Sequence, residues 1–199
     1  MTVTALAIFA TWMALTFGAR TAIALRRTGD SGLRMVSAPP LSTEWWAAVL
    51  MVGALISALV APILDLAGLD PLVERTALGA VGLVVAIVGV TSTLAAQLAM
   101  GDSWRVGVDK AERTQLVTDG VYRLARNPIY TAMVTTAAGI TMMVPNVVAL
   151  AGLAMLVAAL ELQVRFVEEP YLRRTHGASY QRYAGAVGRF LPGVGRLHT

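Results

Sequence analysis

Four charged side chains interrupt the end of the last apolar stretch of the chain, in the sequence ELQVRFVEEP. Glu161, Arg165 and Glu169 follow at intervals of four residues, so a helix places them on one face, with Glu168 beside them. A charge inside a membrane helix is costly and is by default a functional candidate. The acidic pair suits ribose hydroxyls or a cation, and Arg165 suits a carboxylate or phosphate. A structural ladder of ion pairs along this face is the alternative.

A second polar stretch, GVYRLARNPIY at residues 120–130, directly precedes an apolar run. Pro128 suits the first turn of a helix, and Asn127 suits the N-cap position before it. In this structural interpretation Arg123 and Arg126 are interfacial cations, and the two tyrosines belong to an aromatic belt. The alternative is a binding site at the mouth of the helix.

Helix-breaking residues follow the carboxylates. Pro170 disturbs the helix and leaves nearby carbonyl groups without their usual partners. Gly177 is a helix stop signal, and Ser179 is placed to cap a last short helix that carries Tyr180 and Tyr183. Such polar groups, packed against the end of a bundle, form a pocket half in the membrane and half in water. The sequence contains no hydrolytic triad and no glycine-rich phosphate loop in the required context.

The elements that must position these residues are membrane helices. Of the 199 residues, 56% are hydrophobic and only 14% are charged, below the roughly 25% typical of soluble domains. The final uncharged run, 128–160, is about 50 Å long as one helix, too long for one crossing. Pro145 and Asn146 near its middle predict a turn. We therefore expect an all-α, polytopic membrane helix bundle with short cytoplasmic helices forming a cofactor pocket. Its roughly five transmembrane helices are expected at residues 3–25, 44–64, 76–100, 129–144 and 147–167.

The distribution of basic residues predicts the orientation. Most of them fall in the loops after the first and third spans and in the tail, whereas the loop at 65–75 is mostly acidic. By the positive-inside rule, the N-terminus lies outside and the C-terminus and active site are cytoplasmic. The N-terminus lacks a positive n-region, so we expect residues 1–25 to be a retained first span.

The chain divides into two parts in this interpretation. Residues 1–100 form a three-span membrane scaffold. Residues 101–199 form the catalytic part, which consists of a cytoplasmic loop, a helical hairpin and a cytoplasmic tail. The absence of cysteine excludes disulfides and thiolate metal sites, and the two histidines show no ligand spacing, so no metal is expected. We expect membrane lipids and no nucleic acid as partners. Gly79, Gly82 and Gly89 predict close helix packing, with a homodimer as one possibility.

The two polar stretches together resemble a known family. LVTDGVYRLARNPIY and, after the apolar hairpin, EEPYLRRTHGASYQRYAGAVGRFLP resemble integral-membrane methyltransferases of the isoprenylcysteine carboxyl methyltransferase and phospholipid methyltransferase group. The resemblance covers about residues 114–192. The positions that match the family pattern are Leu116, Val117, Gly120, Tyr122, Arg126, Pro128, Tyr130, Glu168, Glu169, Leu172, Gly177, Tyr180, Tyr183 and Pro192. Asn127 stands in place of a family histidine, and His176 in place of a phenylalanine.

The resemblance implies S-adenosyl-L-methionine as methyl donor, bound by these two stretches at the cytoplasmic ends of the last spans. A lipophilic acceptor would reach the methyl group from the bilayer. The implied cofactor-binding residues are Thr114, Gln115, Leu116, Val117, Gly120, Tyr122, Asn127, Pro128, Ile129, Tyr130, Glu168 and Glu169. Arg165 matches a family arginine associated with the substrate, and Arg165 and Glu169 are the expected catalytic residues.

Methyl transfer from a sulfonium is an in-line displacement that gains most from holding two reactants in near-attack geometry. Asn127 can donate and accept hydrogen bonds but cannot titrate, so a mechanism with a base at this position is disfavoured. A carboxylate acceptor is already an anion at neutral pH, whereas an amine needs a proton sink such as Glu168. Arg165 favours the carboxylate. The acceptor stays open among a prenylated carboxylate, a free lipid and an amine head group.

Two other functions are alternatives. Membrane sterol reductases carry a related C-terminal arrangement and use NADPH, but this chain is short for that group. A non-catalytic bundle for lipid binding or transport has no need of the two motif stretches. We therefore expect a methyltransferase that uses S-adenosyl-L-methionine.

Overall fold

The computed structural model describes residues 1–29, 31, 39–101 and 115–197, and the regular elements within them are helices. This confirms the predicted all-α class. An isolated β-bridge also joins Ala125 to Gly188. The helices are α1 (Thr2–Met13), the π-helix η1 (Ala14–Ala19), α2 (Arg20–Thr28), α3 (Thr43–Leu66), α4 (Thr76–Ala99), the 3-10 helix η3 (Gly120–Arg123), α5 (Pro128–Met143), α6 (Val147–Leu162), the π-helix η4 (Gln163–Glu168) and α7 (Glu169–Ala186).

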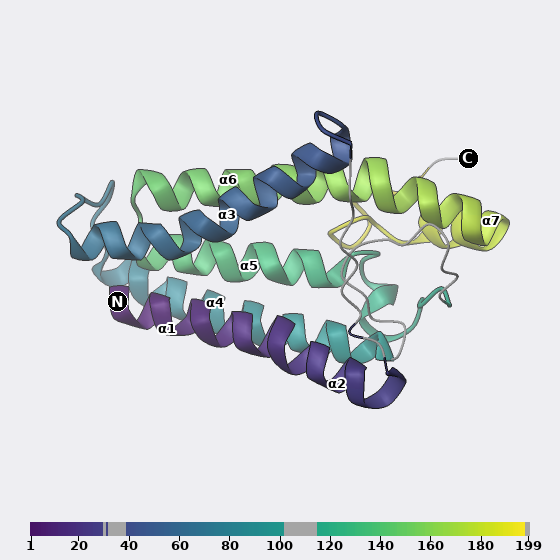
Figure 1. Cartoon of the computed structure of the whole chain (residues 1–199), viewed down its shortest axis with the longest axis horizontal. Helices are drawn as coiled ribbons and strands as arrows, with labels where there is room; N and C mark the ends of the chain where they lie inside the picture. Colours follow the sequence, from purple (N-terminus) through teal and green to yellow (C-terminus); the bar gives the residue numbers. More distant parts are fainter. Residues whose placement is uncertain (30, 32–38, 102–114, 198–199) are drawn as a thin grey trace.

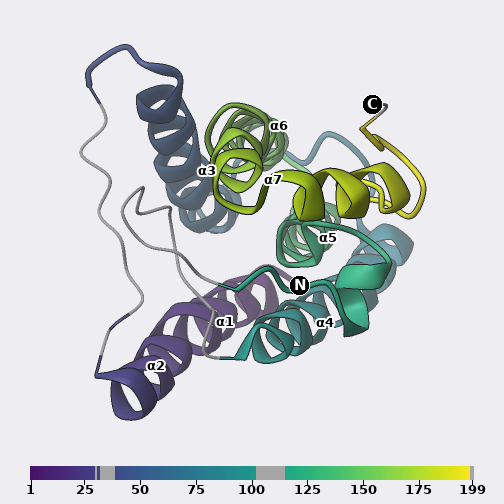
Figure 2. The same ribbon diagram turned by 90° about the vertical axis from the view of Figure 1, so that its right-hand side faces the viewer.

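The chain is an integral membrane protein with the predicted polytopic arrangement. Within the described residues, four helical rods are long and apolar enough to cross a membrane, namely Thr2–Arg27, Thr43–Leu66, Thr76–Ala99 and Val147–Ala186. The fourth predicted span, residues 129–144, corresponds to α5, which has 16 residues and runs between α4 and α6 (Figures 1 and 2). The last rod does not finish at residue 167 as expected, because α6, η4 and α7 continue one another beyond the bundle (Figure 1).

Local capping fixes the turn between α5 and α6. The turn falls at Pro145 and Asn146, as the sequence predicts. Asn146 is fully buried, and its Oδ1 accepts a hydrogen bond of 2.9 Å from the backbone N–H of Ala149 in the first turn of α6. Its Nδ2 donates to the carbonyl of Ala61 in α3 at 2.9 Å. One side chain therefore starts α6 and anchors it to α3.

Glycines bring the helices together in two close pairs. A Cβ added at Gly139 of α5 would lie 2.3 Å from the backbone nitrogen of Ala86 in α4, and one at Gly89 would lie 2.4 Å from Thr136 in α5. In the second pair, a Cβ at Gly152 of α6 would lie 2.7 Å from the Cβ of Ser57 in α3. The predicted close packing is thus confirmed for Gly82 and Gly89 through contacts within one chain, whereas a Cβ at Gly79 would meet the side chain of Met1 at 3.2 Å.

An apolar cavity lies at the seam between these two pairs. Its volume is about 40 Å³, it is partly open to the outside, and α1, α3, α5 and α6 all contribute to its walls. Trp12, Met133 and Leu156 line one end, and Pro62, Val144 and Ala149 line the other. The wall between these two ends is formed mainly by small or aliphatic residues, so the lining of the cavity suits contact with a hydrocarbon chain.

The outer surface of the bundle is apolar along its length. Large hydrophobic side chains such as Val52 and Ile56 on α3, Val84 and Ile87 on α4, and Leu150 on α6 are exposed. In water such contiguous apolar faces are unfavourable, whereas in a bilayer they contact lipid. We call the end of the bundle where α5 begins and η4 follows α6 the polar end, because buried charges gather there.

Candidate active site at the polar end

The first turn of α5 forms one side of the site. The helix begins at Pro128 with Asn127 at the N-cap position, as predicted. The Asn127 side chain, however, makes no capping hydrogen bond to the helix, so that part of the prediction is wrong. Instead its Nδ2 donates to the carbonyl of Arg189 at 3.1 Å, and its backbone N–H donates to the same carbonyl at 3.0 Å. The hydrogen-bond donors of Asn127 are therefore paired with a carbonyl from a segment far along the chain.

Arg126 is buried and forms several hydrogen bonds. The interpretation of Arg126 as a cation at the membrane interface is therefore wrong. Its side chain is 2% exposed. Nη1 donates to the carbonyls of Ala184 and Val187, both at 2.8 Å, and Nη2 donates to the carbonyl of Gly195 at 3.2 Å. Arg123, by contrast, is exposed and pairs with Asp119 at 2.8 Å. The two arginines of the motif thus have different roles, and only Arg126 reaches the interior.

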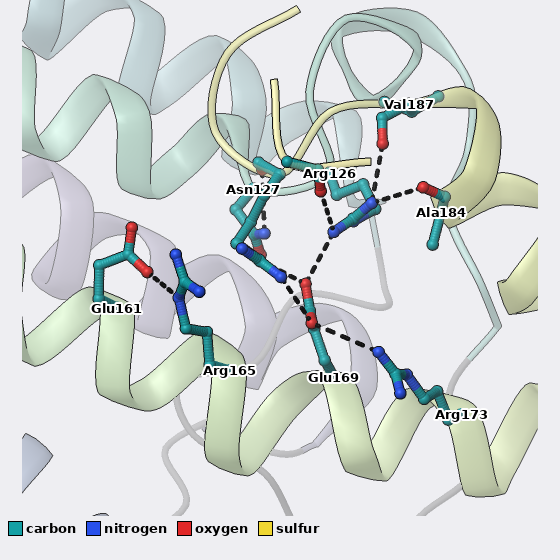
Figure 3. A network of polar contacts seen from close by, with 10 residues as sticks. Arg126, Asn127, Glu161, Arg165, Glu169, Arg173, Ala184 and Val187 are labelled. Carbon is teal, nitrogen blue, oxygen red and sulfur yellow. Dashed lines mark hydrogen bonds and ion pairs between the residues drawn. The ribbon is translucent and has the colours of Figure 1, made fainter. Parts of the chain in front are cut away.

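Glu169 is the acidic centre of the site. Its carboxylate is 5% exposed and accepts hydrogen bonds on Oε1 from Arg126 Nη2 and Arg189 Nε, both at 2.7 Å. Arg189 Nη2 also donates to Oε2 at 3.1 Å, which makes this pair bidentate. The hydrogen bond to Glu169 raises the pKa of Arg189 above its ordinary value. Arg173 Nη2 lies 3.9 Å from Oε2 (Figure 3).

The charged residues of the last helical rod share one face, as the spacing predicts. Glu161, Arg165, Glu169 and Arg173 lie along one side of the rod (Figure 3). Of these four, Glu169 points toward Arg126, whereas Arg173 points along the rod toward Glu169 (Figure 3). Arg165 Nε donates to Glu161 on the preceding turn, and both side chains are partly exposed. The first step of the predicted ladder, from Glu161 to Arg165, is present, whereas Glu169 pairs mainly with Arg126 and Arg189 from other parts of the chain. The rod is a π-helix around Arg165, a geometry frequent at functional sites.

Glu168 faces α5. Its Oε1 accepts a hydrogen bond from the hydroxyl of Tyr130, and Gln163 Nε2 lies within 3.4 Å of the same oxygen. Tyr130 belongs to the first turn of α5, and together with Ile129 it packs against the hydrophobic cluster that contains Trp12, Met133 and Leu156. The two motif stretches therefore meet through this hydrogen bond, next to one end of the cavity.

The remaining predicted residues precede α5. Tyr122 in η3 is buried, its hydroxyl lies 3.3 Å from the carbonyl of Ala96, and burial raises its pKa well above the ordinary value. Tyr183 donates to the carbonyl of Tyr122 at 2.7 Å. Gly120 begins η3 with φ +60°, a conformation that favours glycine. Gln115 is exposed and Leu116 and Val117 are half-buried in the segment before η3, whereas Thr114 lies outside the described residues.

Comparison with known proteins agrees with this arrangement. Residues 77–179, just over half of the chain, match the phospholipid methyltransferase family. The chain belongs to this family. Among curated proteins it is 33% identical over 115 residues to protein-S-isoprenylcysteine O-methyltransferase A of Arabidopsis thaliana. It is 30% identical over 114 residues to a probable protein-S-isoprenylcysteine O-methyltransferase of Oryza sativa subsp. indica. The matches cover 57% and 56% of this chain but only 58% and 60% of these relatives.

A solved structure shows the same fold. The structure of a eukaryotic intramembrane Ras methyltransferase, isoprenylcysteine carboxyl methyltransferase, superposes with a TM-score of 0.60 at 22% sequence identity. It covers 96% of this chain and 68% of the other.

Arg189 and Arg20, both at the polar end, were not singled out as site residues in the sequence. Arg189 contacts both Glu169 and, through its carbonyl, Asn127, and its only signal was a basic residue in the late GRFLP stretch. Arg20 lies inside the expected first span but is only 3% exposed, and its Nη2 donates to the carbonyl of Gly101 at 3.2 Å. A charge within an apolar span was the signal for Arg20.

Proposed function

We propose that this member of the phospholipid methyltransferase family transfers a methyl group from S-adenosyl-L-methionine to a lipophilic acceptor at the polar end. The observation that carries the proposal is the hydrogen bond between Tyr130 and Glu168, which joins the two motif stretches beside the apolar cavity. A water-soluble donor and a lipid acceptor require such a junction of a polar pocket with an apolar space. The names of the curated relatives support methyl transfer.

The chemistry of the side chains fits the donor. S-adenosyl-L-methionine carries a sulfonium, an ammonium group, a carboxylate and ribose hydroxyls. The carboxylate of Glu168 suits the cationic or hydroxyl groups, and the half-exposed guanidinium of Arg173 suits the carboxylate. When bound, the donor supplies the electrophilic methyl group. The proposed wall of its site consists of residues 115–117, Gly120, Tyr122, residues 127–130 and Glu168, and Glu169 follows Glu168 in the chain.

The acceptor is proposed to be a carboxylate on an apolar chain. Arg165 is partly exposed on the face directed at Asn127, and it can exchange its ion pair with Glu161 for the acceptor carboxylate (Figure 3). A carboxylate is already nucleophilic at neutral pH, so the site needs orientation and no base. This agrees with the replacement of a titrating side chain by Asn127. The curated relatives are named for isoprenylcysteine, which makes a prenylated carboxylate the first acceptor to test.

The cavity is proposed to hold the acceptor chain. Its near end includes Met133, one helical turn from Tyr130, and its far end includes Val144. These positions are about 16 Å apart along α5 at 1.5 Å per residue. Because α1 and α3 supply part of the wall, residues 1–100 contribute to the acceptor site as well as forming a scaffold. The proposed orientation puts the polar end and the C-terminus in the cytoplasm and the N-terminus outside.

The first test is calorimetric binding of S-adenosyl-L-methionine and S-adenosyl-L-homocysteine to detergent-purified protein, with NADPH as the control ligand. We expect both adenosyl compounds to bind and NADPH not to bind. The variant Glu168→Gln should lose affinity, whereas Arg123→Gln, at an exposed position outside the site, should not. Methylation of N-acetyl-S-farnesylcysteine then tests the acceptor. Binding of NADPH alone supports a reductase, and binding of neither ligand supports a non-catalytic bundle.

A further inference from the structure

The end of the chain folds back over the first turn of α5. We call residues 187–197 the strap. The backbone N–H of Arg126 donates to the carbonyl of Gly188 at 2.9 Å, and the hydroxyl of Thr131 donates to the carbonyl of Phe190 at 2.7 Å. The backbone N–H of Leu197 donates to the carbonyl of Ala184 at 2.9 Å. The strap is therefore bonded to α5 near its start and to α7 at its end.

Buried charges hold this segment in place. Arg189, in the strap, forms the bidentate pair with Glu169 at the start of α7 and is 12% exposed. Arg126 pairs with the same carboxylate, and it also donates to the carbonyls of Val187 and Gly195, near both ends of the strap. Three side chains from three parts of the chain thus converge on one buried point.

This geometry leaves Glu169 little capacity for a ligand. Its two oxygens already accept three hydrogen bonds from two arginines, and the side chain is 5% exposed. Removing one partner of a buried ion pair is strongly unfavourable because it leaves an uncompensated charge. A direct contact between Glu169 and a donor molecule would have to break one of these pairs. Glu169 is better placed to act through its partners.

We propose that Arg126, Glu169 and Arg189 form a latch that fixes the strap, and that Arg189 is a positioning residue for the donor site. The link to the site is Asn127, whose backbone N–H and side-chain amide both donate to the carbonyl of Arg189. When the latch is intact, this carbonyl sets the position of Asn127 and of the turn that carries Tyr130. The second part of the proposal rests on the function proposed above, and the first part does not.

The latch itself is tested by hydrogen–deuterium exchange of residues 187–197 in purified protein without any donor. We expect Arg189→Gln and Glu169→Gln to speed exchange in the strap while leaving α3 and α4 protected. Arg182→Gln is the matched control, because Arg182 is an exposed arginine on α7 whose nearest partner is Ser179 at 3.4 Å. Unchanged protection of the strap in both latch variants overturns the latch. Arg189→Lys, which keeps the charge but not the bidentate geometry, provides a milder variant with intermediate exchange.

The positioning role is tested by the affinity for S-adenosyl-L-homocysteine. We expect Arg189→Gln and Glu169→Gln each to weaken binding by about tenfold. The double variant should be no weaker than the worse single one, because both changes break the same latch. Loss in Glu169→Gln with full affinity in Arg189→Gln would make Glu169 a direct ligand and refute the role of Arg189. If the unchanged protein binds no donor, the proposed function fails, while the exchange measurement still decides the latch.

Discussion

A single methyl group added at Gly139 provides a direct test of the contact between α4 and α5. Gly139 lies in the close contact between α5 and α4, and the Cβ of an alanine would be 2.3 Å from the nitrogen of Ala86 and 2.6 Å from the carbonyl oxygen of Gly82. Both are backbone atoms, so no flexible side chain can move away. Ordinary contact begins near 3.4 Å, so the helices must separate by about 1 Å locally.

The magnitude follows from two opposing effects. Overpacking of a close interface costs about 1–3 kcal/mol, whereas replacement of glycine by alanine within a helix gains up to about 1 kcal/mol. The net expectation for Gly139→Ala is a loss of about 1–2 kcal/mol in the free energy of unfolding. Gly18→Ala is the matched control, because a Cβ at Gly18 meets nothing within 4 Å. This variant should be neutral or stabilised.

The assay is reversible unfolding in mixed micelles by added dodecyl sulfate, followed by circular dichroism. Because α5 begins with the proposed donor-binding turn, Gly139→Ala should also weaken S-adenosyl-L-homocysteine binding, whereas Gly18→Ala should not. Equal stability of the two alanine variants would refute the close approach of α4 and α5. If Gly139→Ala lowers the stability but leaves S-adenosyl-L-homocysteine binding unchanged, the close packing of α4 and α5 is supported. Donor binding then does not depend on the position of α5.

Four further changes test other parts of the molecule. Glu168→Gln removes the carboxylate that accepts from Tyr130, and calorimetry should show a loss of donor affinity of about tenfold or more; unchanged affinity places the donor elsewhere. Arg165→Gln should raise KM for a carboxylate acceptor without changing donor affinity, and a similar rise for an amine with the same tail argues against carboxylate recognition. Ala137→Trp fills the cavity, so turnover of a farnesyl-bearing acceptor should fall more than that of a short-tailed one; equal losses contradict a tail site there. Asp65→Asn weakens the pair with Arg75 at 2.7 Å, which should lower the unfolding free energy by about 1–3 kcal/mol at unchanged donor affinity, and full stability in micelles counts against a structural role.

Features decided by local chemistry were predictable from the sequence. Pro128 starts α5 because its fixed φ and missing N–H suit a first helical turn. Asn146 ends the hairpin turn because its side chain can cap α6. Gly177 interrupts the regular geometry of α7 with φ +50°, as expected of a stop signal, although the helix resumes after it. In each case the residue type restricts its own backbone or that of its neighbours.

Features decided by distant partners were not predictable in the same way. Arg126 and Arg123 look equivalent in GVYRLARNPIY, but only Arg126 meets the strap and is buried. The charge spacing correctly placed Glu169 on the face of Arg165, yet its partners are Arg126 and Arg189, which lie 43 and 20 residues away in the chain. The periodicity of the sequence predicts on which face of its own helix a side chain lies. It does not predict which distant segment of the chain contacts that face.

The contact between Tyr130 and Glu168 spans the seam between the two helix pairs. Tyr130 lies on α5, which packs against α4, and Glu168 ends the π-helix that continues α6, which packs against α3. At the opposite end the same two pairs are joined by the short turn at Asn146, whose side chain also holds α3. Widening of the seam at the polar end must therefore either break the Tyr130–Glu168 hydrogen bond or move both elements together. In the proposed function, an acceptor chain that entered the cavity from this end would meet the same two residues that are assigned to the donor site. We therefore expect this hydrogen bond to couple the binding of the two proposed substrates.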